Sequence, residues 1–355
     1  MAIHAWHPTL MSLPGDRLLA TFDLGQAVES LDYRTYFSHS NDGGATWSPP
    51  TPMFEDSRSR RSTHTIRTAR LRDGSLVAVG GRFFRDDPEE GICNRANMGL
   101  VEMELFLLRS SDEGRTWDGP EPLLPPLVGP AFEVAHGIVE LRDGRWLWPT
   151  STWKGWNGAA PNGMKAVAFV SYDRGKTWPE YIDIFDGYRE GLIHFEQSVV
   201  VLPDGRLLAC AWVIDERTGR TRDVVYSISG DGRRFNSPTS TGLPGETSKL
   251  VVLPDGRAAC FFRSLDEPGL GVSWVSIRGD QWITEQRMTA WQGAPTALFG
   301  ARPAADELGD LKLGYPSPVA LPNGEVICAF WCRVNDVNEI RWVRLDSKSR
   351  DDETQ

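Results

Sequence analysis

The stretch Ser110-Ser111-Asp112-Glu113-Gly114-Arg115-Thr116-Trp117 decides the fold, because its pattern Ser-x-Asp-x-Gly-x-Thr-Trp recurs along the chain. Residues 40–47 and 171–178 repeat it in full, residues 229–235 form a shortened copy and residues 276–282 a decayed one. In each copy, Ser and Asp are expected to bond backbone groups of a turn, while Gly supplies the necessary backbone freedom. The motif therefore predicts a repeated turn in which the aspartates are structural.

A second motif, a tight turn between two apolar runs, lies in phase with the first. It occurs at residues 13–16, 71–74, 141–144, 202–205, 253–256 and 321–324. Asp-Gly or Asn-Gly in such a place is a strong hairpin signal, since the turn requires positive φ. The Asp of the first motif precedes the Gly of the next turn by 32 residues in three successive repeats (74 − 42, 144 − 112 and 205 − 173).

This spacing leaves room for about four short strands in each of six units, and no long helical pattern interrupts them. Radial repetition of four-stranded sheets is a β-propeller. The sequence thus predicts an all-β fold, a six-bladed propeller of four-stranded antiparallel blades. Residues 1–345 are expected to form this single domain, and residues 346–355 a polar C-terminal tail. The strand that closes the ring is expected to be short or absent.

Composition excludes several classes of function. The 355 residues carry 38 basic and 48 acidic side chains, a net charge of −10, which argues against a nucleic-acid partner. No apolar run reaches the roughly 18 residues that a membrane helix needs, so no membrane partner is expected. The first residues lack a secretion signal, which predicts a cytoplasmic protein, or a secreted one if a leader was removed. The five cysteines and six histidines show no metal-ligand spacing, and neither a metal nor another cofactor is expected. The oligomeric state stays open.

Polar and aromatic residues gather where each inner strand should start and each second strand should end. In an antiparallel blade these two points meet at the face opposite the hairpin turns. The starts carry His7, Arg67, His136, Glu196, Glu246 and Tyr315, and the ends carry Asp23, Arg82, Trp153, Lys154, Trp212, Arg263, Trp331 and Arg333. Indole faces suit sugars, and guanidinium groups suit carboxylates. We therefore predict a carbohydrate pocket at this rim.

Two segments extend the argument to a family. Residues 195–205 and 314–319, together with the repeated turns, resemble the sialidases and the wider group of Asp-box glycoside hydrolases. The resemblance implies that Tyr315 is the nucleophile and that Glu196 takes its proton, since a phenol has a pKa near 10. Sialidases are the known exception to catalysis by two carboxylates. The resemblance places the general acid in the first blade, where Asp32 or Asp23 is the nearest counterpart, and we assign it to Asp32.

The sequence also departs from the sialidase pattern. Trp6-His7-Pro8 stands where sialidases have Arg-Ile-Pro, Trp212 stands at the place of a second arginine, and residues 299–303 do not match the segment of the third. A set of arginines that binds an anionic substrate would have to consist of Arg67, Arg82, Arg263 and Arg333 instead. The predicted substrate-binding residues are Arg67, Arg82, His136, Trp212, Glu246, Arg263, Trp331 and Arg333.

The resemblance implies an exo-acting glycoside hydrolase for sialic acid or another terminal sugar, acidic sugars included. The alternative is a non-catalytic propeller that only binds carbohydrate. Single residues also have structural interpretations: Tyr315 as part of a core strand, Glu246 as the partner of an arginine, and His136 as a hydrogen-bonded loop residue.

Overall fold

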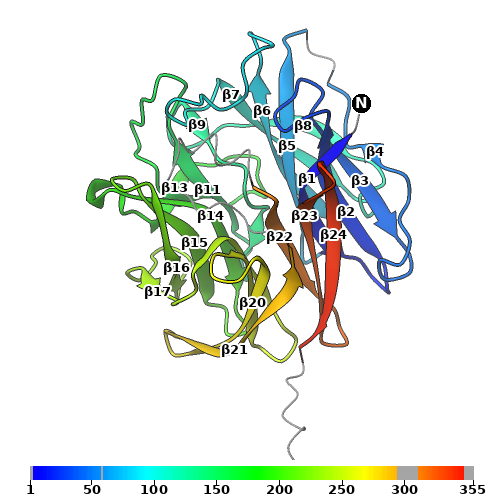
Figure 1. Cartoon of the computed structure of the whole chain (residues 1–355), viewed down its shortest axis with the longest axis vertical. Coiled ribbons are helices and arrows are strands. Elements are labelled where there is room, and N and C mark those ends of the chain that lie inside the picture. Colours follow the sequence, from blue (N-terminus) through cyan, green and yellow to red (C-terminus); the bar gives the residue numbers. More distant parts are fainter. Residues whose placement is uncertain (1–2, 57–58, 294–310, 348–355) are drawn as a thin grey trace, which may run out of the picture.

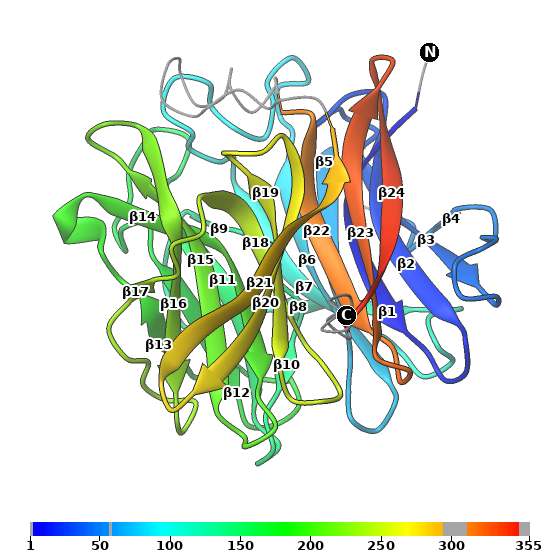
Figure 2. The same ribbon diagram turned by 60° about the horizontal axis from the view of Figure 1, so that its bottom comes forward.

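The computed structural model describes residues 3–56, 59–293 and 311–347, and it confirms a six-bladed β-propeller (Figures 1 and 2). Blade 1 comprises β1 (His4–Ser12), β2 (Leu18–Gly25), β3 (Arg34–Ser40) and β4 (Thr51–Pro52). Blade 2 comprises β5 (Ser62–Arg70), β6 (Leu76–Phe84), β7 (Met103–Ser110) and β8 (Asp118–Leu123). In blade 3, two short strands, β9 (Ala131–Phe132) and β10 (Val139–Glu140), both pair with β11 (Trp146–Trp153), followed by β12 (Ala166–Ser171) and β13 (Glu180–Phe185).

The remaining blades follow a short 3-10 helix, η1 (Tyr188–Glu190). Blade 4 comprises β14 (Leu192–Val201), β15 (Leu207–Asp215), β16 (Arg220–Ser229) and β17 (Thr239–Ser240). Blade 5 comprises β18 (Gly245–Val252), β19 (Ala258–Ser264), β20 (Gly269–Arg278) and β21 (Gln281–Gln292). Blade 6 comprises β22 (Leu313–Ala320), β23 (Glu325–Val334) and β24 (Val337–Asp346), three strands among the described residues.

The two sequence motifs form the turns that were predicted from them. The Asp-Gly turn joins the first two strands of a blade: in blade 2, Gly74 N–H donates to the carbonyl of Leu71. The Ser-x-Asp-x-Gly-x-Thr-Trp motif joins the last two strands. There Asp112 accepts hydrogen bonds from the backbone and hydroxyl of Thr116, and the Ser110 hydroxyl oxygen accepts one from Gly114 N–H. In blades that carry these motifs, the local sequence therefore determines where the chain turns from one strand to the next.

Two details of the prediction are wrong. Residues 276–282 do not form a decayed copy of the motif, because Ser276 lies within β20 and pairs with Ile283 across a plain hairpin. The tail does not start at residue 346, because Asp346 still pairs with Glu325 in the last sheet. The rest of the predicted tail beyond Ser347 lies outside the described residues.

The hydrophobic core lies between neighbouring blades rather than within one sheet. The fully buried indoles of Trp146 and Trp148 in blade 3 pack with Val79 and Leu107 of blade 2. Burial of each such large apolar side chain contributes about 1.5–3 kcal/mol to stability. Each blade therefore depends on its neighbours, and the inner ends of all six are held at one rim.

The ring closes between the first and last blades, where β1 packs beside β22, β23 and β24 (Figure 1). The Leu10 N–H donates to the Ser317 hydroxyl, and the Asn338 N–H donates to the His4 ring. Closure thus relies on side-chain bonds between blades. Among the described residues, no helix has the length and apolar character needed to cross a membrane.

Candidate functional site

Four inner strands carry the same irregularity at the rim. The pairing of β1, β14, β18 and β22 with the next strand skips at a β-bulge. The bulged residues have left-handed φ angles, and they are His7 (50°), Glu196 (48°), Thr247 (48°) and Tyr315 (55°). Such a backbone is uncommon outside glycine, and bulges of this kind redirect a side chain. All four residues line one cavity.

This cavity has a volume of about 1210 Å³ and is bordered by residues of all six blades. It contains most of the predicted site residues: Arg67, Glu196, Trp212, Arg263, Tyr315, Trp331 and Arg333. Its wall also contains acidic and aromatic residues that were not predicted, among them Glu133, Tyr33 and Trp156. The prediction that polar and aromatic residues surround a pocket at this rim therefore agrees with the position of the cavity.

Four predicted site residues lie elsewhere. Asp32 accepts hydrogen bonds from the Gln26 N–H and the Ser30 hydroxyl within an exposed loop, and it does not line the cavity. Arg82 is buried beside Phe106, where it pairs with Asp56. The predicted catalytic role of Asp32 and the predicted substrate-binding role of Arg82 are therefore replaced by local structural roles.

His136 and Glu246 are corrected in the same way. The His136 ring accepts from the Val199 N–H and bonds the Gly137 carbonyl, so both ring nitrogens are used within the protein. Glu246 is fully buried and paired with Arg263 at 2.7 Å. The bulge in β18 explains this, because it presents Thr247 and not Glu246 to the cavity.

Tyr315 belongs to a buried polar network. Its hydroxyl accepts a hydrogen bond from Arg67 Nε at 3.2 Å, and Arg67 Nη1 lies 3.7 Å from the Asp23 carboxylate. Asp23 also accepts from the hydroxyls of Tyr33 and Thr65. Burial raises the pKa of Tyr315. Asp23 differs: burial alone would raise its pKa, but the hydrogen bond from His7 and the charge of Arg67 lower it.

A pair of carboxyl groups lies next to this network. The backbone N–H of Glu196 donates to Glu133 Oε2 at 2.9 Å. Burial, and then the neighbouring charge of Glu196, raise the pKa of Glu133 to about 7. Among the described residues, nothing donates a hydrogen bond to Glu196 Oε2, which is buried. At neutral pH, therefore, Glu133 holds a proton part of the time, which is the property of a general acid.

Sequence reasoning missed Glu133 and Thr247, although a signal for Thr247 exists. Counting six residues back from the leucine of each hairpin turn reaches His7, Thr65, Ala135, Glu196, Thr247 and Tyr315. Five of these residues line the cavity, Ala135 being the exception. In blade 3 the residues that line the cavity are instead Phe132, Glu133 and Val134, just before Ala135, where the inner strand is interrupted between β9 and β10. Had the sequence prediction used this constant spacing of six residues, it would have placed Thr65, Ala135 and Thr247 at the rim. It would not have chosen Arg67, His136 and Glu246 as the first residues of their inner strands.

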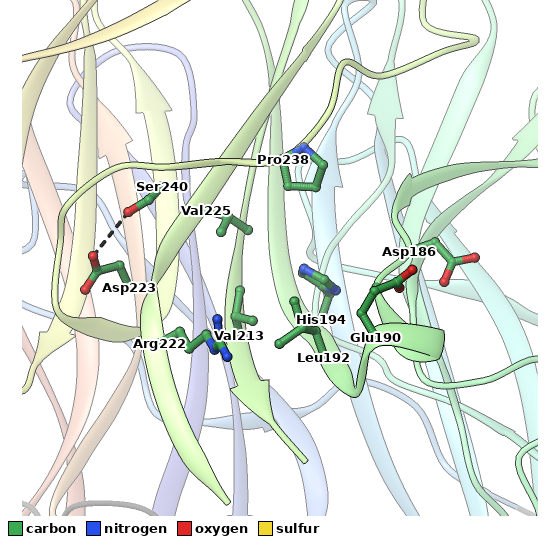
Figure 3. A pocket seen from close by; sticks show the side chains of 11 residues that line it. Asp186, Glu190, Leu192, His194, Val213, Arg222, Asp223, Val225, Pro238 and Ser240 are labelled. Atoms are coloured by element: carbon green, nitrogen blue, oxygen red, sulfur yellow. Dashed lines mark hydrogen bonds between the residues drawn. The ribbon is translucent and has the colours of Figure 1, made fainter. Parts of the chain in front are cut away.

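A second groove, of about 680 Å³, lies along blade 4 and is lined by residues from β14 to β17 (Figure 3). Leu192, Val213 and Val225 form its apolar wall, and Asp223 is hydrogen-bonded to Ser240. Burial lowers the pKa of His194, beside this wall, to about 4, so its ring is neutral at pH 7. We place the functional site at the central cavity, because Glu133 and Glu196 both line it and residues of all six blades border it. No group of three or more Asp, Glu, His or Cys side chains within the described ranges is suited to hold a metal ion.

Comparison with known proteins agrees with this architecture. Residues 90–328, more than half of the chain, match the BNR repeat-like domain family. The chain belongs to that family. Comparison with curated protein sequences gives no match.

Solved structures similar to this BNR repeat-like protein include enzymes. A protein of unknown function from Dyadobacter fermentans has 20% identity and a TM-score of 0.70, with 98% of this chain and 95% of that chain covered. A Penicillium chrysogenum α-L-arabinanase complexed with arabinobiose has 15% identity and a TM-score of 0.66, with 97% and 93% covered.

A Trypanosoma rangeli sialidase in complex with 2,3-difluorosialic acid has 17% identity and a TM-score of 0.67. The alignment covers 96% of this chain but only 54% of the sialidase, so the chain spans about half of that protein's length. At these identities the likeness concerns the fold. The predicted resemblance to the sialidase superfamily is thereby confirmed at that level.

Proposed function

We propose that this BNR repeat-like protein is an exo-acting glycoside hydrolase whose catalytic groups are the carboxyls of Glu133 and Glu196. The observation that carries the proposal is that Glu133 and Glu196 both line the cavity, where the Glu196 backbone N–H donates to the Glu133 carboxyl group and the pKa of Glu133 is raised to about 7. Residues from all six blades surround the cavity. Such a bowl admits the end of a carbohydrate chain rather than its middle, which favours exo action.

In this proposal the two carboxyl groups have different roles in the cleavage of the glycosidic bond. Glu133 donates its proton to the leaving oxygen as the bond from that oxygen to the anomeric carbon breaks. Glu196, as the carboxylate, acts on the anomeric carbon either directly or through a water molecule that it deprotonates. The Tyr315 hydroxyl does not contact Glu196 in any described hydrogen bond and is instead bonded by Arg67. In this proposal Tyr315 therefore positions substrate and Arg67, and does not attack.

The charges of the cavity favour a neutral sugar. Arg67 is bound to Asp23 and Tyr315, and Arg263 is bound to Glu246, so both buried guanidinium groups are already paired. Arg85 donates to the backbone carbonyls of Glu29 and Glu90. Arg82 is likewise paired with Asp56, so three of the four arginines that the sequence suggested for an anion are already paired with carboxylates. The fourth, Arg333, lines the cavity and pairs with the exposed Asp336. The likenesses to the α-L-arabinanase and to the sialidase concern the fold alone, so the preference for a neutral sugar is drawn from the pairing of these buried arginines.

A panel of aryl glycosides tests the proposal. We expect turnover of an aryl glycoside of a neutral pentose or hexose, with kcat/KM at least about a hundredfold above that for aryl sialosides and uronides. The ratio corresponds to roughly 3 kcal/mol, the penalty of a partly buried charge without a partner. The measurement is the initial rate of aryl alcohol release by purified protein.

The control for a contaminating enzyme is the Glu133→Gln/Glu196→Gln double variant purified in the same way. Preferred turnover of the sialoside would contradict the neutral-sugar assignment. Saturable oligosaccharide binding without turnover across the panel would favour the alternative, a propeller that only binds carbohydrate.

The proposal also fixes the direction of the pH dependence. Glu133 acts only when protonated, and its pKa of about 7 keeps a large protonated fraction up to neutrality. We expect kcat/KM to fall above pH 7, by about tenfold per pH unit, as this proton is lost. The measurement is a pH–rate profile with a substrate whose alkoxide leaving group needs protonation. A value of kcat/KM that stays constant up to pH 9 would contradict the assignment of Glu133 as the general acid.

A further inference from the structure

The same position in four inner strands is occupied by three hydroxyl side chains and one lysine. Pairing resumes after the rim bulge at Thr9, Ser198, Lys249 and Ser317. Ser198 and Ser317 each accept a hydrogen bond from a backbone N–H of a neighbouring blade, Leu250 and Leu10 respectively. A small hydroxyl is therefore sufficient to join blades at this position. The lysine in blade 5 is an exception that the scaffold does not require.

Lys249 is buried, with 7% of its surface exposed, and its ammonium group reaches from blade 5 to the backbone of blades 3 and 4. Nζ donates to three backbone carbonyls, those of Ala135 and Glu196 at 3.1 Å and that of Gln197 at 3.3 Å. Three acceptors use three N–H donors, which only the protonated amine supplies. The group therefore carries its charge, although burial lowers its pKa.

The carbonyl bonds join blades 3, 4 and 5 at the point where Glu196 takes its left-handed backbone angle. They also place the ammonium group 4.8 Å from the centre of the Tyr315 ring. The charged and titratable groups that face Lys249 are Glu133, Glu196, Arg67, Tyr315, His136 and Cys210. Among the described residues, the Lys249 ammonium group is hydrogen-bonded to backbone carbonyls, and the charges of Glu196 and Glu133 act on it.

We propose that Lys249 is a positioning residue for the Glu133–Glu196 pair: it holds the Glu196 bulge in place and supplies the charge that lets two carboxyl groups share one site. The inference rests on the proposed function, since it concerns the same two carboxyls. Two like charges at close range raise each other's proton affinity, and a fixed cation opposes that effect. Without Lys249, Glu133 would hold its proton to higher pH.

The test is a titration of the carboxyl carbons by NMR in protein labelled with ¹³C at glutamate. In Lys249→Met we expect the Glu133 midpoint to move up by about one pH unit relative to the unaltered protein. Lys249→Arg keeps the charge and should leave the midpoint within a few tenths of a unit. The Glu133→Gln variant assigns the resonance. This readout needs no substrate, so it gives a result even if the glycosidase proposal fails.

The pH–rate profile provides the second readout. The limb of the Lys249→Met profile that reports the Glu133 proton should move to higher pH, because Glu133 loses the nearby charge that lowers its pKa. A lower rate with that limb unmoved would indicate a structural role only. Should Lys249→Met fail to fold, Lys249→Ser introduces the hydroxyl found at the equivalent positions of blades 4 and 6. Midpoints that do not move in either folded neutral variant would overturn the proposal.

Discussion

Replacing Glu196 by glutamine is expected to lower kcat/KM by at least about a thousandfold on every substrate that the protein cleaves. The amide cannot attack the anomeric carbon and cannot take a proton from water, so the loss does not depend on the leaving group. Because Glu196 Oε2 lacks a described hydrogen-bond donor, the replacement breaks no visible contact in the folded protein. The measurement is kcat/KM for substrates with good and poor leaving groups.

Glu133→Gln is expected to behave differently. A proton donor matters most when the leaving group is a poor one, and general acids contribute about 10²–10⁴-fold. The variant should therefore lose most activity on an alkyl glycoside and little on a dinitrophenyl glycoside. It should also lose the decline in rate above pH 7. Equal losses on both substrates would contradict the assignment of Glu133 as the acid.

Two control variants sharpen this comparison. Glu121→Gln changes an exposed glutamate paired with Arg109 on an outer strand and should leave kcat/KM unchanged. Tyr315→Phe removes one hydrogen bond from Arg67 and should cost roughly tenfold, the worth of one such bond. If Tyr315→Phe instead abolished activity while Glu196→Gln retained some, the tyrosine would be the nucleophile, as the resemblance to sialidases implies.

Replacing Arg67 by methionine is expected to destabilise the fold by about 3 kcal/mol. Arg67 is buried, and its removal would leave the fully buried Asp23 carboxylate without its guanidinium partner. Breaking a buried ion pair from one side costs about 3–5 kcal/mol, and the hydroxyls of Tyr33 and Thr65 offset part of that cost. The measurement is the free energy of unfolding in urea, with circular dichroism as the check on the fold.

The matched control is Arg174→Met, which breaks an exposed pair with Asp73 at 2.6 Å and should cost less than about 1 kcal/mol. The Arg67→Met/Asp23→Asn double variant removes both charges. It should be more stable than the sum of the single losses, because the penalty of an unpaired buried charge is absent. Equal destabilisation by Arg67→Met and Arg174→Met would show that the buried network does not depend on this ion pair.

The resemblance of residues 195–205 and 314–319 to sialidases correctly indicated a shared fold but suggested a chemistry that the contacts do not favour. The same strand register carries Glu196 and Tyr315 to one cavity, as predicted. Within that cavity, Glu196 lies with Glu133 and Tyr315 lies with Arg67. The prediction of Asp32 as the acid is wrong in geometry, because that side chain is satisfied inside its own loop.

The sequence by itself determined the number of blades, the position of the turns that the two repeated motifs form and the rim at which the polar residues meet. These features depend on short segments such as 110–117, in which neighbouring side chains bond the backbone of their own turn. The tertiary structure alone decided which rim residues share the cavity. A bulge that shifts pairing by one residue exchanges Glu246 for Thr247, since successive side chains of a strand point to opposite faces. The partners of Glu133, Arg67 and Lys249 belong to other blades, and local sequence carries no signal of a contact made across the ring.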